Sequence, residues 1–194
     1  MTIDTEQRGR PADPDNPRRL LEALAAAAAA PASFFIQGRW AGAYPDLARR
    51  IAADGHLIGN HSYYHAPMNL LTDEGIRNSV GRAEEAIVAA TGVDPRPWFR
   101  CPYGEGEDDA RVLALLAELG YRNVTWDFET DDWQTGRDAG ALIETVVRGC
   151  RDHGDGARVL LHSWPDVTVA ALPEMIVCLR AAGAELVRLD DFAA

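Results

Sequence analysis

The stretch Gly55-His56-Leu57-Ile58-Gly59-Asn60-His61-Ser62-Tyr63-Tyr64-His65 is the most informative part of the chain. Its apolar residues 57 and 58 follow a glycine suited to ending a helix, and they predict a short buried strand. His61 and His65 come just after that strand, four residues apart. One helical turn would bring both imidazoles to the same side, as binding of a divalent metal ion requires. Taken alone, this spacing is weak, because such pairs are more often ordinary surface or core histidines.

Apolar runs and helical patterns alternate on both sides of this stretch. Strands are predicted at residues 1–3, 33–38, 57–58, 98–99, 123–126, 158–161 and 185–187, and helices at residues 18–30, 44–54, 73–90, 109–119, 140–150 and 170–182. About seven β/α units require a parallel sheet covered by helices, so the predicted fold class is α/β. The spacing leaves a barrel and an open doubly wound sheet as alternatives. The chain length predicts one domain over residues 1–194.

Charge and composition exclude several classes of partner. The chain has 30 acidic and 19 basic residues, a formal net charge of −11. This charge repels polyanions and anionic bilayers, so neither nucleic acid nor a membrane is an expected partner. No signal peptide pattern or membrane-length apolar run is present in the sequence as written, which predicts a cytoplasmic location. Three irregularly spaced cysteines predict reduced thiols.

Polar side chains directly follow several predicted strands. In parallel β/α proteins the carboxyl ends of the strands meet at one mouth, so these side chains are expected to converge. Two imidazoles and one carboxylate would hold a metal ion with a position left open for water, and a histidine beside them is suited to proton transfer. A core or capping histidine is the alternative for position 162. The set comprises Asp4, Glu6, His61, His65, Arg100, Asp132 and His162.

These residues resemble, in order and over nearly the whole chain, the motifs of the polysaccharide deacetylases. The family is also called the NodB homology domain or carbohydrate esterase family four. Residues 55–65 are similar to its GHEIGNHTxxH motif, in which both histidines bind the metal. The resemblance implies a distorted (β/α)7 barrel of the NodB type.

Two further motifs lie in the middle of the chain. Arg100-Cys101-Pro102-Tyr103-Gly104 resembles the RxPYG motif. There the arginine orients the catalytic aspartate, and the backbone N–H of the tyrosine, here Tyr103, helps to hold the oxyanion. Residues 126–133 resemble the fourth motif. Its ending implies that Asp132 pairs with Arg100 and that Trp133 forms a wall of the acetyl pocket.

The fifth and first motifs complete the resemblance. Leu160-Leu161-His162 matches the fifth, which implies His162 as the general acid and Leu160 beside the substrate. The first motif usually reads TFDDG, whereas this chain has Thr2-Ile3-Asp4-Thr5-Glu6. By analogy with relatives whose two acids are two residues apart, Asp4 would be the catalytic base and Glu6 the metal ligand.

The resemblance implies a metal-dependent hydrolase of N-linked acetyl groups. Its carbohydrate substrate would contain N-acetylglucosamine, as an oligo- or polysaccharide of the chitin, chito-oligosaccharide or peptidoglycan type. Zn²⁺ is the expected ion, with Co²⁺, Mn²⁺ and Ni²⁺ as alternatives. Two other functions stay open: hydrolysis of O-acetyl esters or of a non-sugar amide, and non-catalytic carbohydrate binding by a relative that has lost its metal. The second is motivated by Thr5.

Overall fold

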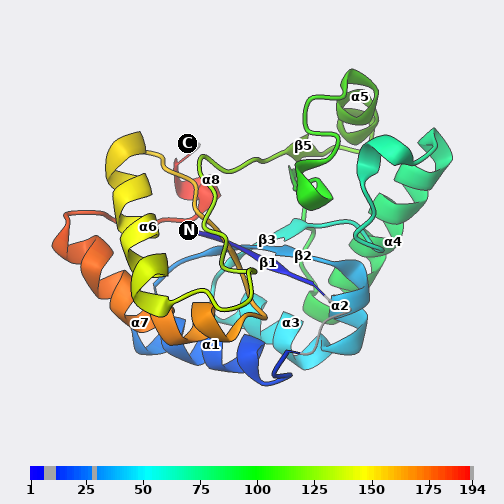
Figure 1. Ribbon diagram of the computed structural model, residues 1–194. Coiled ribbons are helices and arrows are strands. Elements are labelled where there is room, and N and C mark those ends of the chain that lie inside the picture. Colours follow the sequence, from blue (N-terminus) through cyan, green and yellow to red (C-terminus); the bar gives the residue numbers. More distant parts are fainter. Residues whose placement is uncertain (7–11, 28–29, 193–194) are drawn as a thin grey trace.

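A parallel sheet forms the centre of the computed structural model, which describes residues 1–6, 12–27 and 30–192 (Figure 1). Every neighbouring pair of strands is parallel, in the order β5-β4-β3-β2-β1-β6. The α/β class is therefore confirmed. The strands of the described residues are β1 (Thr2–Thr5), β2 (Ser33–Ile36), β3 (Leu57–Asn60), β4 (Trp98–Phe99), β5 (Arg122–Asn123) and β6 (Leu160–His162).

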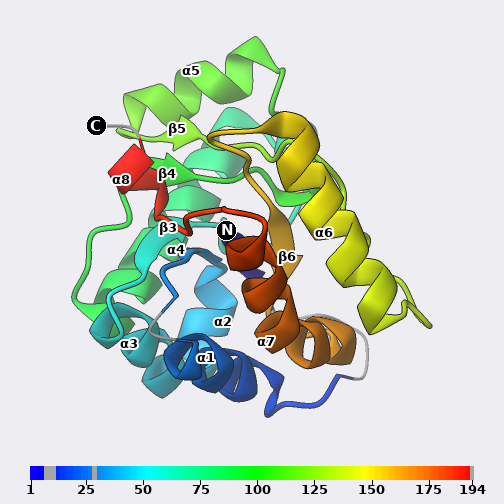
Figure 2. The same cartoon turned by 90° about the vertical axis from the view of Figure 1, so that its left-hand side faces the viewer.

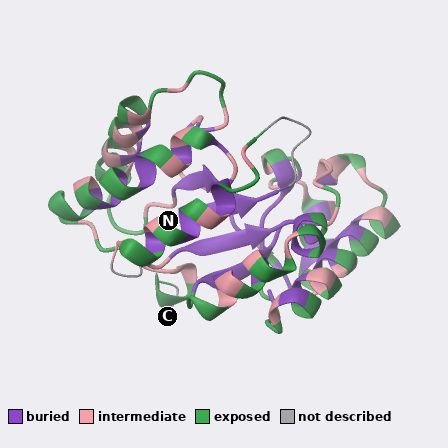
Figure 3. Ribbon diagram, turned by 90° about the horizontal axis from the view of Figure 1, so that it is seen from below, coloured by how far each residue is buried: buried purple, intermediate pink, exposed green. Residues whose placement is uncertain are grey.

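Helices cover the sheet, and its first three strands are therefore buried along their whole length. In Figure 3 the central strands are buried, and the helices are buried mainly where they face the sheet. In Figure 2, α6 runs along one side of the molecule, next to α7. The helices are α1 (Asn16–Ala26), α2 (Gly38–Ala43), α3 (Pro45–Ala53), α4 (Asp73–Thr91), α5 (Ala110–Glu118), α6 (Ala139–His153), α7 (Asp166–Ala181) and α8 (Leu189–Phe192), with 3₁₀ turns η1 (Met68–Leu70) and η2 (Pro102–Gly104).

Helix α4 shows how local sequence sets an element. It begins where the Thr72 hydroxyl accepts a hydrogen bond from the Gly75 N–H, at 3.1 Å. It ends at Thr91, and the next residue, Gly92, has a left-handed φ of 73° that glycine readily adopts. Ile76 and Val80 are among the fully buried residues of its inner face. This helix lies beside the loop that follows β3, which it contacts through Ser79.

The predicted strand at residues 185–187 is wrong. Residues 184–188 form no ladder with the sheet, and Leu186 packs half-buried against the main core. Its side chain thus gains burial without strand pairing. As a result, the described residues contain six strands, whereas about seven β/α units were expected.

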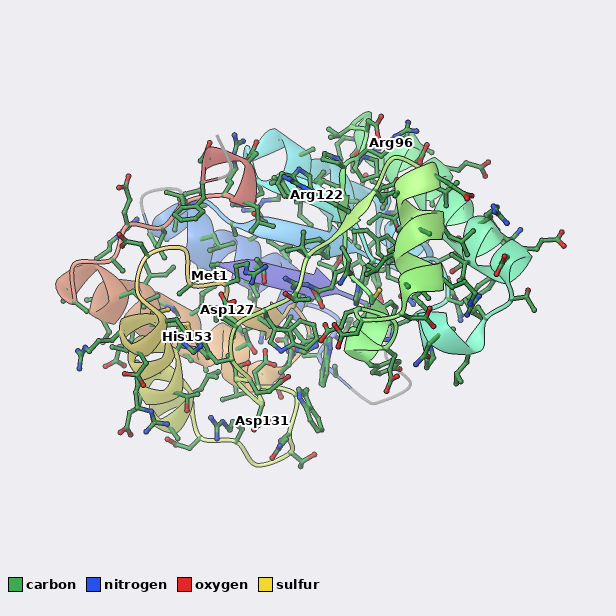
Figure 4. The ribbon with its side chains drawn as sticks, turned by 90° about the horizontal axis from the view of Figure 1, so that it is seen from above. Met1, Arg96, Arg122, Asp127, Asp131 and His153 are labelled. Carbon is green, nitrogen blue, oxygen red and sulfur yellow. The ribbon has the colours of Figure 1, made fainter. Side chains whose placement is uncertain are left out.

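The sheet is interrupted between β5 and β6. Strand β5 ends at Asn123, and the chain then crosses toward β6, where the Asp127 N–H donates to the Arg158 carbonyl at 3.0 Å. Phe128 and Val159 form an isolated parallel bridge just beyond. Figure 4 labels Asp127 at this crossing. The architecture is barrel-like, with short contacts between residues 127–128 and 158–159 beside this gap.

Several helix boundaries also differ from the expectation. Helix α1 ends at Ala26, before the predicted end at residue 30, and residues 28 and 29 lie outside the described part of the chain. Helix α7 begins at Asp166, four residues earlier than predicted, and α2 was not predicted. Within the described residues, no helix combines the length and apolar character needed to cross a bilayer.

Candidate active site

The register of the sheet brings the predicted polar residues to one end. Asp4 on β1 is the direct partner of His162 on β6, and the Ser163 N–H donates to the Asp4 carbonyl at 3.0 Å. Side chains alternate along a strand, so Asp4 and Glu6 face the same side. Thr5 faces away, and its hydroxyl lies 3.4 Å from the Phe35 carbonyl oxygen. The strand therefore delivers two carboxylates to one place and keeps Thr5 out of it.

Glu6, His61 and His65 form a cluster that could hold a metal ion, in which Glu6 and His61 are buried and His65 is partly buried. One donor atom from each lies within 4.8 Å of the others. His65 Nε2 is 2.5 Å from Glu6 Oε2 and 3.0 Å from His61 Nε2. The carboxylate Oδ2 of Asp4 is 3.4 Å from His61 Nε2. The structure thus gathers all three predicted ligands, with the predicted base next to them.

The backbone around the histidines fixes which ring nitrogen faces the cluster. His61 Nδ1 lies 2.9 Å from the Arg100 carbonyl oxygen. A carbonyl oxygen only accepts, so the neutral ring carries its proton on Nδ1 and presents the Nε2 lone pair to the cluster. This is the tautomer that metal coordination needs.

The two histidines do not lie on a helical turn, so that part of the prediction is wrong. Residues 61–67 form a loop in which Ser62 and His65 have left-handed φ angles of 58° and 59°. The Asn60 side chain accepts from the Ser62 N–H at 2.9 Å, and the Ser62 hydroxyl accepts from the His65 N–H at 3.1 Å. The Ser79 hydroxyl on α4 accepts from the Tyr63 N–H at 3.1 Å. These bonds compensate the strained backbone and point both rings inward.

Arg100 pairs with Asp4, and the predicted pairing with Asp132 is wrong. Arg100 Nη1 donates to Asp4 Oδ1 at 2.8 Å, and both side chains are buried. Arg100 Nε donates to the Val124 carbonyl at 3.1 Å, and the guanidinium lies 4.1 Å from the centre of the Phe35 ring. This arrangement fixes one oxygen of Asp4 and leaves the other directed at His61.

Asp132 pairs with His162. Its Oδ1 lies 2.7 Å from His162 Nδ1, and its Oδ2 accepts from the His162 N–H at 2.7 Å. The Thr168 hydroxyl, in the first turn of α7, donates to the same Oδ2 at 2.7 Å. Burial lowers the pKa of His162, but the charge and hydrogen bond of Asp132 outweigh burial and raise the pKa above its usual range. His162 is therefore suited to hold a proton.

The three residues predicted to contact the substrate differ in their exposure. Tyr103 lies in η2 with φ 59° and ψ 10°, and its exposed ring is 4.4 Å from the His65 ring. Trp133 is half-buried on the loop that follows Asp131, a residue labelled in Figure 4. Leu160 is buried in β6. The oxyanion and acetyl-pocket roles of these residues stay predictions.

The electrostatics of the cluster suit a divalent cation. Burial raises the pKa of Glu6, but the hydrogen bond from His65 and the charges of the nearby histidines outweigh it and hold the pKa well below its usual range. Burial lowers the pKa of His61 to about 4, even though Asp4 opposes that shift. At neutral pH Glu6 is thus anionic and His61 neutral, the states in which both side chains bind metals.

Two contacts were missed from the sequence. Thr168 binds Asp132, as described above, and the Trp164 indole N–H donates to Glu6 Oε1 at 3.1 Å. Trp164 comes two residues after His162, so the alternation along an extended chain was the available signal. For Thr168, which acts from the first turn of α7, no sequence signal was available.

A cavity of about 640 Å³ lies elsewhere. Its lining includes Thr2 and Val159, at the amino ends of β1 and β6, whereas the histidine cluster lies at the carboxyl ends. Glu6, His61 and His65 do not line this cavity. The convergent side chains therefore define the candidate site.

Sequence comparisons agree with this geometry. The model of the family described as polysaccharide deacetylase matches residues 1–124. A peptidoglycan-N-acetylglucosamine deacetylase of Bacillus cereus is 31% identical over 165 residues, covering 82% of this chain and 57% of that protein. A chitooligosaccharide deacetylase of Rhizobium leguminosarum bv. trifolii is 35% identical over 133 residues, covering 68% and 58%. The chain thus spans little more than half the length of these curated relatives.

Solved structures give the same fold. A family 4 carbohydrate esterase from Streptomyces lividans, in complex with acetate, aligns with a TM-score of 0.81 and 31% identity, covering 94% of this chain and 87% of that one. A wild-type pseudoenzyme of the same esterase family from Bacillus anthracis aligns with a TM-score of 0.85 and 27% identity, covering 100% of this chain and 65% of that one. The chain belongs to the polysaccharide deacetylase family. Its fold is the barrel-like type of these esterases, as predicted.

Proposed function

We propose that this chain is a metal-dependent deacetylase that removes N-linked acetyl groups from oligo- or polysaccharides containing N-acetylglucosamine, of the chitin, chito-oligosaccharide or peptidoglycan type. The main support is the position of Asp4, which touches Arg100 on one oxygen and lies 3.4 Å from His61 on the other. The substrate class is supported by the names of the relatives from Bacillus cereus and Rhizobium leguminosarum.

Glu6, His61 and His65 would hold the metal ion. Two imidazole nitrogens and one carboxylate oxygen form a donor set typical of catalytic zinc sites, which makes Zn²⁺ the ion we propose. Co²⁺, Mn²⁺ and Ni²⁺ accept the same donors. When bound, the ion would supply Lewis-acid polarisation of the acetyl carbonyl and activation of water.

The other residues divide the proton transfers between them. Asp4, held by Arg100, would accept a proton from the attacking water through the oxygen that faces His61. The Tyr103 N–H would donate to the oxyanion, an interaction of about 3 kcal/mol by analogy with other hydrolases. His162, with Nδ1 bonded to Asp132, would give the proton on Nε2 to the departing amine. The C–N bond then breaks, which releases acetate and leaves a free amino sugar.

Metal content and acetate release, measured on one preparation, test the proposal. We expect about one bound divalent ion per chain and acetate release from an N-acetylglucosamine oligomer. The double variant His61→Ala/His65→Ala should lose both. His153→Ala is the matched control, because His153 is exposed at the end of α6. Acetate release at the wild-type rate in the double variant would refute the proposal.

A substrate panel separates this function from other acyl hydrolyses. The same residues attack any suitably placed acyl carbon, so an O-acetyl ester or a non-sugar amide is the nearest alternative. Chito-oligosaccharides, acetylated xylan and small amides should be compared by kcat/KM. A clear preference for either of the last two would replace the proposed substrate.

Non-catalytic carbohydrate binding is the second candidate. Two observations favour it: a relative of the same fold is a pseudoenzyme, and this chain has Thr5 where the family resemblance places an aspartate. Glycan binding without acetate release, in a protein that takes up no metal after supplementation, would select this candidate.

A further inference from the structure

The carboxylate of Glu6 contacts a different partner with each oxygen. Oε2 lies 2.5 Å from His65 Nε2, within the metal-ligand cluster. Oε1 accepts a hydrogen bond from the Trp164 indole N–H at 3.1 Å. A glutamate has one more rotatable bond than an aspartate, so its carboxylate needs an additional contact to stay in one orientation. The indole provides such a contact on the oxygen that does not face the histidines.

Trp164 is itself held in place. Its backbone carbonyl accepts from the side-chain amide of Asn16 at 2.8 Å, and the same amide donates to Asp166 at 2.6 Å. Asn16 is buried at the start of α1, and Asp166 begins α7. The backbone at Trp164 is therefore held by contacts at the start of two helices, which fixes the position from which its indole reaches Glu6.

The Trp164 ring also borders the candidate general acid. Its centre is 5.9 Å from that of His162, with the two planes tilted by 53°. His162 is bonded to Asp132 through Nδ1, so the indole contacts the Glu6 side of the site without replacing any partner of His162. The Trp164 side chain thus neighbours both the metal-ligand cluster and His162.

The geometry points to Trp164 as a positioning residue for a metal ligand: its indole N–H fixes the carboxylate of Glu6 so that Oε2 is presented to the ion. This inference rests on the proposed function, because it assumes that the cluster binds a divalent cation. Outer partners that orient metal ligands typically contribute about 10- to 100-fold to metal affinity. Trp164 is expected to have an effect of that size, transmitted through Glu6.

The test is the Zn²⁺ dissociation constant of metal-free protein, measured by competition with a chromophoric chelator. Trp164→Phe keeps an aromatic ring and removes the N–H, and it should raise the dissociation constant about 10- to 100-fold. Trp126→Phe is the matched control, because the Trp126 indole donates to Glu129 at 2.7 Å, a bond of the same kind outside the cluster. The control should leave the dissociation constant within about twofold of wild type.

A double-mutant cycle separates positioning from a general structural effect. If Trp164 acts through Glu6, adding Trp164→Phe to Glu6→Ala should change Zn²⁺ affinity less than twofold. Thermal unfolding of each metal-free variant checks that it is folded, and Trp164→Leu, which also lacks a donor, serves as a second variant if the phenylalanine protein is not. An equal loss of affinity in both backgrounds, or an unchanged dissociation constant in Trp164→Phe, overturns this inference alone. A wild-type protein that binds no Zn²⁺ overturns the proposed function together with it.

Discussion

Replacing Arg100 with methionine would leave the carboxylate of Asp4 buried without its cationic partner. The Asp4 side chain is only 5% exposed, so water cannot substitute for the guanidinium. Removing one member of a buried ion pair costs about 3–5 kcal/mol. A domain of this size loses about 2–4 °C of melting temperature per kcal/mol, so the fall should be roughly 6–20 °C. Such a loss is a large part of the roughly 5–15 kcal/mol that stabilises a typical fold.

Urea unfolding of metal-free protein measures this loss, and a cycle with Asp4→Asn isolates the pair. The double variant Asp4→Asn/Arg100→Met buries no unpaired charge, so it should be more stable than the sum of the single changes predicts, by at least about 1 kcal/mol. Arg77→Met is the control: Arg77 lies 2.8 Å from Glu118 in an exposed pair, whose loss should cost less than about 1 kcal/mol. Additive losses in the cycle, or a loss below 1 kcal/mol for Arg100→Met, would refute the reasoning.

Three further predictions concern the general acid, a helix contact and the metal. Asp132→Asn removes the charge that raises the pKa of His162, so His162 should lose its proton at lower pH and the alkaline limb of kcat/KM should move to lower pH, as a pH–rate profile would show. In Gly38→Ala the new Cβ would lie 2.6 Å from Tyr63 and 2.7 Å from the Ala83 backbone, so urea unfolding should show a loss of about 1–3 kcal/mol. Adding Zn²⁺ at 100 times its dissociation constant should stabilise the metal-free protein by about 2.7 kcal/mol, measured by thermal unfolding.

Each of these has its own control. Asp131→Asn removes a neighbouring charge that does not touch His162, and an alkaline limb that moves equally in both variants contradicts the assigned pairing. Gly81→Ala places a Cβ in open space on α4 and should be neutral or slightly stabilising. If it destabilises as much as Gly38→Ala, close contact is not the cause. For the metal, the double histidine variant should show no stabilisation by Zn²⁺.

The sequence predicted the elements whose signals are local. The apolar runs at β2 and β3 and the capped amphipathic helix α4 appear close to where they were expected. The convergence of Asp4, Glu6, His61, His65 and His162 was predicted from one topological rule: the carboxyl ends of parallel strands meet at one end of the sheet. The predicted strand at residues 185–187 failed because Leu186 reaches the core without pairing.

Pairings inside the site depend on register and on distant helices, which local patterns do not encode. Arg100, which follows β4, donates to Asp4 on β1, whereas Asp132 is bonded to His162 and to Thr168 on α7. The turn at Ser62 depends on Asn60 and on a hydroxyl from α4. The four-residue spacing of the two histidines predicted a helical turn, whereas the structure places them on a loop. The predicted roles of Tyr103, Trp133 and Leu160, the identity of the ion, and the single-domain boundary stay predictions.

Asp4 and Glu6 lie on the same side at the end of β1, so the proposed base and the proposed metal ligand both depend on the alternation of side chains along this strand. Substitution can change either acid and leave the other in place. A deletion or insertion at position 5, in contrast, cannot keep both acids on one side, because side chains alternate along an extended chain. Such a change in length would therefore separate the carboxylate proposed as the base from the one proposed as the metal ligand.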